Sequence, residues 1–138
     1  MSKKIQQSVL LLLAMVVGVL FLSSCNENND NKAQVEQHKK LAGELRDNRL
    51  YQAAVDEYEN ILSFNQIDFK TRANINYLIA KIYFENIRDY ENASAFYIRA
   101  RSLDPDGSFY NEASRNLVTS LEKMGNLLVA KRELDAIT

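Results

Sequence analysis

The chain has 138 residues, of which 46% are hydrophobic and 25% are charged, a balance typical of a folded domain and not of a disordered or collagen-like chain. Its formal net charge is −1, so it lacks the basic excess that nucleic-acid-binding domains carry, and we expect no nucleic-acid partner. One cysteine and one histidine are too few ligands for a zinc site or an iron–sulfur cluster. We therefore predict no catalysis, no metal and no cofactor.

The first 25 residues have the layout of an export signal. Lys3 and Lys4 precede an apolar run over 9–22 (VLLLLAMVVGVLFL), which has the length of a secretory hydrophobic region and is shorter than the ~20 residues of a bilayer-spanning helix. The run ends in Leu22-Ser23-Ser24-Cys25, which resembles the bacterial lipobox. That resemblance implies a lipoprotein signal peptide over 1–24, cleavage before Cys25, a diacylglyceryl group on its sulfur and a fatty acid such as palmitate on the new amino terminus.

The alternative is that the apolar run is an uncleaved membrane anchor and that the cysteine after it is incidental.

If Cys25 is lipidated, two or three acyl chains attach the protein durably, since each buried methylene contributes roughly 0.8 kcal/mol. The polar segment over 25–32 (CNENNDNK) is then predicted to be a flexible tether. By resemblance to proteobacterial sorting patterns, Asn26 is not the aspartate that retains a lipoprotein in the inner membrane, which favours the outer membrane, facing the periplasm.

From Ala33 onward the apolar residues recur with helical spacing, and no stretch alternates as a strand does. This predicts an all-α domain over 33–138, with helices near 33–47, 51–64, 70–86, 90–103, 109–125 and 127–137. The second helices of the three pairs share columns that advance by 39 and then 37 residues: Tyr51, Tyr90 and Leu127; Ala54, Ala93 and Ala130; Tyr58, Tyr97 and Leu134; Ile61, Ala100 and Ile137. Helical pairs repeated at this length indicate a solenoid, in which each unit buries its faces against its neighbours.

These repeats resemble the tetratricopeptide-repeat (TPR) family. The middle repeat carries most of the motif, in Ala80, Tyr83, Tyr90, Ala93, Tyr97, Ala100 and Pro105, with one extra residue in the turn over 86–89. The resemblance implies a right-handed α-solenoid of about three helix-turn-helix repeats, over 33–66, 70–105 and 109–138. The residues that we expect to pack the repeats together are Ala42, Ala54, Tyr58, Ala80, Ala93, Tyr97, Ala130 and Leu134. Pro105 should stop the preceding helix, and Asp106 or Ser108 should cap the next.

In TPR arrays the first helix of each pair lines an inner groove, and that mapping selects a candidate peptide site: Lys39, Arg46, Tyr77, Lys81, Phe84, Arg115 and Glu122. Two aromatic rings seven residues apart are suited to gripping a peptide, and the cations to holding its carboxylates. The alternative is that these side chains contact adjoining helices or form a solvated face. The carboxylate clamp of the chaperone-tail-binding members is not matched, because Gly43, Leu78, Glu112 and Asn116 occupy its other positions. His38 has no nucleophile or acid placed beside it by a recognisable motif.

We therefore expect a lipid-anchored, non-catalytic scaffold that binds a protein or peptide in a complex of the bacterial cell envelope. The alternative is that the chain is the anchored N-terminal part of a longer envelope enzyme or chaperone, such as a peptidyl-prolyl isomerase fusion. The packing helix over 127–137 has no polar cap of the kind that repeat arrays need, and its leucines are suited to docking or self-association.

Overall fold

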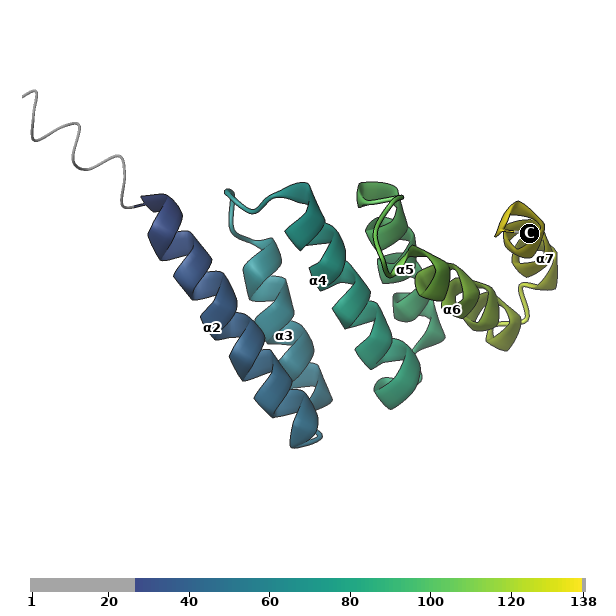
Figure 1. Cartoon of the computed structure of the whole chain (residues 1–138). Coiled ribbons are helices and arrows are strands. Elements are labelled where there is room, and N and C mark those ends of the chain that lie inside the picture. The colour runs from purple at the N-terminus through teal and green to yellow at the C-terminus, as the bar shows by residue number, and fades with distance from the viewer. Residues whose placement is uncertain (1–26, 138) are drawn as a thin grey trace, which may run out of the picture. The chain divides into compact units, whose positions relative to one another are not determined.

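The computed structural model describes residues 27–137, and within that range it is entirely helical (Figure 1). The elements are α2 (Glu27–Asp47), α3 (Tyr51–Leu62), α4 (Phe69–Lys81), the π-helix η1 (Ile82–Ile87), α5 (Tyr90–Leu103), α6 (Tyr110–Lys123) and α7 (Leu127–Ile137). The predicted all-α class is confirmed, and the predicted helix over 70–86 is α4 continued by η1. The predicted signal peptide over 1–24 and the predicted lipidation site Cys25 lie outside the described residues. Between residues 27 and 137 no helix combines the length and the apolar character that crossing a membrane requires.

The first helix begins earlier than predicted. The backbone of α2 is helical from Glu27, so most of the segment predicted to be a flexible tether is helix. No proline or glycine interrupts the chain between 27 and 42, and extending an existing helix avoids the cost of nucleating a new one. The polar composition excludes the segment from a core, but it does not by itself decide between helix and coil.

The repeats lie in the compact unit that begins at Val35. There α4 and η1 pack on α5, α6 packs on α7, and α3 and α5 join the successive pairs by contacting α4 and α6. The column of alanines is buried as its spacing predicts: Ala54 and Ala93 are fully buried, and Ala130 is 2% exposed. A methyl group at these positions lets neighbouring helices approach to the short end of the ~8–10 Å interaxial range.

One predicted packing residue is not buried. Ala42, Ala80 and Tyr97 are 0% exposed and Tyr58 is 4% exposed, but Leu134 is 45% exposed. The equivalent Tyr97 is contacted by the following repeat, since Asn116 donates to its hydroxyl at 3.0 Å. α7 packs mainly on α6 and is also joined to α5 by the ion pair between Arg101 and Glu133. Its outer side stays open, with Leu127 and Leu128 66% and 81% exposed.

Each repeat makes its internal turn with a residue at positive φ: Arg49 (63°), Arg88 (63°) and Gly125 (77°). These positions follow the same 39- and 37-residue spacing as the repeats. In the first and third turns the amide three residues past the end of the helix donates to the carbonyl five residues before it. These bonds run from Leu50 N to Leu45 O and from Asn126 N to Leu121 O, both at 2.9 Å. This is the Schellman arrangement that ends helices.

The extra residue of the middle repeat is absorbed in η1. The turn after it has the Asp89 amide bonded to the Tyr83 carbonyl at 3.0 Å, and the last turn of the first helix widens from α to π geometry over Ile82–Ile87. A single inserted residue is commonly accommodated in this way. The insertion predicted for the turn over 86–89 therefore changes the helix that precedes it.

The loop between α5 and α6 positions an aromatic side chain. As predicted, α5 ends before Pro105, but the prediction that Asp106 or Ser108 caps α6 is wrong, because Phe109 is the N-cap and makes no side-chain cap bond. Instead the Tyr110 amide donates to the Gly107 carbonyl at 2.9 Å. A Cβ at Gly107 would lie 2.9 Å from Phe109 Cζ, so glycine is what permits the ring to fold back over the loop.

Candidate functional site

A polar cluster on the first helices links the second repeat to the third. Lys81 on α4 places its Nζ 3.2 Å from Glu112 Oε1 on α6 and 3.4 Å from Glu85 Oε1 on η1. The same Nζ lies 5.7 Å from the centre of the Tyr77 ring, and the Tyr77 hydroxyl hydrogen-bonds to Glu112. Residues 77, 81 and 85 lie on one face of the helix because they are four residues apart.

The charges in this cluster stabilise one another. The hydrogen bond from Tyr77 lowers the pKa of Glu112, with Lys81 adding to the effect against the opposing influence of burial. Burial disfavours the charged form of Lys81, but Glu112 and Glu85 outweigh it, and the pKa of Lys81 is raised. Burial, with Glu112, also raises the pKa of Tyr77. At neutral pH the cluster is therefore a fixed ion pair beside a neutral hydroxyl.

A cavity of about 120 Å³ lies next to this cluster, and its lining residues come from α2, α3, α4 and η1. It brings together three of the predicted groove residues, Arg46, Tyr77 and Lys81, and Leu78 also lines it. Pockets for drug-sized ligands usually measure ~300–1,000 Å³, so this cavity has room for a side chain of a partner. Arg46 at its edge is exposed and bonds Asp47 at 3.0 Å.

The two predicted aromatic anchors are not free to grip a ligand. Tyr77 is 9% exposed and stacks on Phe109 with ring centres 5.0 Å apart. Phe84 is half-buried and meets Tyr90 and Tyr97 edge-on, at 5.9 and 6.2 Å. These rings pack adjoining helices, which was the alternative that the sequence left open, because each repeat must cover the apolar face of the next.

The remaining predicted groove residues are more open. Lys39 pairs with Glu36 at 3.3 Å, and Arg115 and Glu122 are exposed. These three do not line the cavity beside Lys81. They remain available for contact with a partner, but the structure does not gather them into one site.

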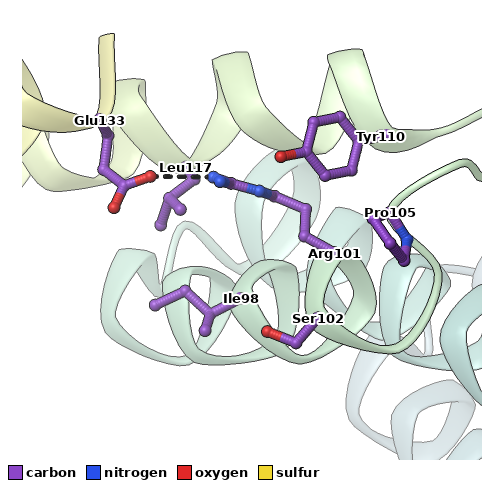
Figure 2. A pocket seen from close by; sticks show the side chains of 7 residues that line it. All are labelled: Ile98, Arg101, Ser102, Pro105, Tyr110, Leu117 and Glu133. Atoms are coloured by element: carbon purple, nitrogen blue, oxygen red, sulfur yellow. Dashed lines mark hydrogen bonds and ion pairs between the residues drawn. The ribbon is translucent and has the colours of Figure 1, made fainter. Parts of the chain in front are cut away.

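The structure also contains a cavity that sequence reasoning missed. It measures about 380 Å³ and lies among α5, α6 and α7 (Figure 2). Figure 2 shows Arg101 extending between Tyr110 and Glu133; its Nη1 donates to Glu133 Oε2 at 3.0 Å, and its guanidinium carbon lies 5.2 Å from the Tyr110 ring centre. No short motif marks this contact, because its partners are 32 residues apart.

His38 has a structural partner. Its Nδ1 lies 2.6 Å from Glu57 Oε2, and its ring meets Phe64 edge-on at 5.7 Å. This contact joins α2 to α3 within the first repeat. Across residues 27–137 no group of three or more histidine, cysteine, aspartate or glutamate side chains is arranged to hold a metal ion.

Comparison with solved structures decides the fold. The second TPR of Spaghetti (RPAP3), bound to the HSP90 peptide SRMEEVD, matches with a TM-score of 0.62 and 22% identity, over 80% of this chain and 95% of that chain. The fold is that of a TPR domain. No protein-family model matches the chain, and no curated protein is significantly similar to it in sequence. The TPR fold predicted from the alanine and aromatic columns is thus confirmed.

Proposed function

We propose that this TPR domain is a protein-interaction scaffold without catalytic activity, and that it binds a peptide segment of a partner on the face formed by its first helices. The observation that carries the proposal is the TPR fold with a side-chain-sized cavity on that face, lined by Arg46, Tyr77 and Lys81. The structural neighbour, which has the same fold, is bound to a peptide.

The chemistry of this face differs from a clamp for a terminal carboxylate. The Lys81 charge is already matched by Glu85 and Glu112, and the amide of Asn116 donates to the Tyr97 hydroxyl at 3.0 Å, so neither is free for a ligand carboxylate. We infer that the partner places one side chain in the cavity, meets Arg46 at the edge of the cavity, and meets the exposed Arg115 elsewhere on the same face. A peptide such as SRMEEVD should bind weakly or not at all.

We further propose that lipid on Cys25 holds the domain at a bacterial envelope membrane, at the outer membrane facing the periplasm. The support is the lipobox-like sequence Leu22-Ser23-Ser24-Cys25 after the apolar run. Anchoring would raise the local concentration of the domain around its partner without any additional contact.

Two measurements on the full chain expressed in a bacterium test this function. The intact mass of protein from the membrane fraction should correspond to residues 25–138 plus diacylglycerol, and the lipid should be lost in Cys25→Ala. A photo-crosslinking residue at position 46 or 115 should give a discrete adduct, and one at the control position Arg132, on α7, should not. An unmodified chain that retains Met1 refutes the anchor; equal adducts at all three positions refute the binding face.

A further inference from the structure

We propose that the face formed by the second helices carries another docking surface, centred on Ile98 of α5, which accepts an acidic amphipathic helix of a partner protein. This surface lies apart from the cavity assigned above, since the two share no lining residue. The proposal therefore goes beyond the proposed function and can fail independently of it.

Two cavities meet at Ile98. The one among α5, α6 and α7 measures about 380 Å³, and the one among α3, α4 and α5 measures about 440 Å³. Ile98 and Ser102 line both, so they form a ridge between two hollows. Ile98 is 50% exposed, whereas the nearby Ala100 and Tyr97 are fully buried. Apolar side chains of a partner helix could occupy both hollows and cover the isoleucine, as ridges fit into grooves.

The charges around these hollows favour an acidic partner. The described residues lining them include three arginines, Arg72, Arg99 and Arg101, and one carboxylate, Glu133. Arg72 is held by the carbonyls of Leu62 and Phe64, at 2.9 and 3.4 Å. The exposed Arg99 lies over the Phe96 ring, 4.7 Å from its centre. Neither contact neutralises the positive charge.

Arg101 adds an unused donor. Its side chain is 16% exposed and bonds Glu133, and its buried Nε has no hydrogen-bond partner among the described residues. A guanidinium carries five N–H donors in a rigid fork, and a buried donor without an acceptor is rare in folded proteins. A carboxylate or carbonyl oxygen entering the cavity shown in Figure 2 would meet a group whose hydrogen-bonding capacity is only partly used.

These features favour a protein partner over an anionic membrane surface. Arg72 and Arg101 lie against protein atoms with their donors directed to Leu62, Phe64 and Glu133, whereas membrane-binding basic residues need to project from the surface. Among the described residues that line the two hollows, Ile98 is the one large apolar side chain that is exposed. An isoleucine set between two hollows suits a ridged partner better than a flat lipid layer.

The test uses the full chain in neutral detergent and a fluorescein-labelled amphipathic helix with Leu at i, i+3, i+4 and i+7 and Glu elsewhere. A counterpart with Lys in place of Glu controls for charge. We expect fluorescence anisotropy to show binding of the Glu peptide and not of the Lys peptide. Arg99→Glu and Ile98→Asp should each weaken binding about tenfold, the equivalent of about 1.4 kcal/mol. The charge reversal Lys40→Glu, at an exposed position of α2 that lines none of these cavities, should leave binding unchanged.

Glu133→Gln gives a prediction of opposite sign. Removing the carboxylate from the cavity should tighten binding of the Glu peptide severalfold, and a merely destabilising substitution would not. The proposal is overturned if Arg99→Glu binds like the parent, if the Lys peptide binds equally, or if neither peptide binds. It is also overturned if anionic phosphatidylglycerol vesicles bind through Ile98 and Arg99 while the Glu peptide does not.

Discussion

Replacing Ala93 with leucine should destabilise the domain by overpacking. Ala93 is fully buried on α5, three residues after Tyr90 and four before Tyr97, and the rings at both of these positions contact Phe84 of η1 at 5.9 and 6.2 Å. Leucine adds three carbon atoms between these rings, and overpacking of this kind costs about 1–3 kcal/mol. Intrinsic helix propensity does not offset the loss, because alanine and leucine are both strong helix formers.

Thermal and urea unfolding followed by circular dichroism measure this cost. For a domain near this size, each kcal/mol shifts Tm by roughly 4–8 °C, so Ala93→Leu should lower Tm by about 5–20 °C. Ala136→Leu is the matched control, because Ala136 is exposed on α7 and the same side chain can extend into solvent there. If Ala93→Leu unfolds at the same temperature as the parent, the inference that helices approach closely at Ala54, Ala93 and Ala130 is wrong.

Three further predictions concern turns, caps and pH. Gly125 has φ 77°, and a Cβ added there would meet no other atom. Gly125→Ala should therefore lower the unfolding free energy only by the cost of a left-handed backbone for an L-residue, about 1–2 kcal/mol. Arg88→Gly should raise Tm in the same assay, because Arg88 has φ 63°. Asp89→Ala should cost about 1 kcal/mol, because its carboxylate accepts the Asn92 amide at 3.0 Å, whereas Asp89→Asn should keep the cap. Hydrogen bonds from the Asn92 backbone amide and side chain lower the pKa of Asp89 in the folded state, so the charged carboxylate stabilises the fold at neutral pH. The pKa of aspartate in the unfolded chain is about 4. This contribution to stability is therefore lost as the pH falls from about 4 through the lower pKa of the folded state. Urea titrations at pH 7 and pH 3 should therefore show a smaller acid-induced loss in Asp89→Asn than in the parent.

The helical architecture could be predicted because it depends on local and periodic information. Apolar spacing gives each helix its buried stripe, and alanine recurring at 54, 93 and 130 marks where helices approach closely. These signals lie within one helix or recur at a fixed interval, so they can be recognised in the sequence without knowledge of the fold. The first-helix face was predicted less well. Arg46, Tyr77 and Lys81 do lie together, but Tyr77 and Phe84 pack adjoining helices, and helical position does not distinguish an aromatic ring that covers the next repeat from one that faces a ligand.

The sequence by itself therefore determined the helical class, the repeat length, the buried alanines and the stop before Pro105, all of which follow from short-range physics. Only the tertiary structure decided that Lys81 pairs with Glu112, that His38 meets Glu57, and that Arg101 bonds Glu133 with its Nε unpartnered among the described residues. Each of these contacts joins residues on different helices, and its existence depends on the distance and rotation between those helices. Those quantities are set by the packing of many side chains together, which no single stretch of sequence specifies.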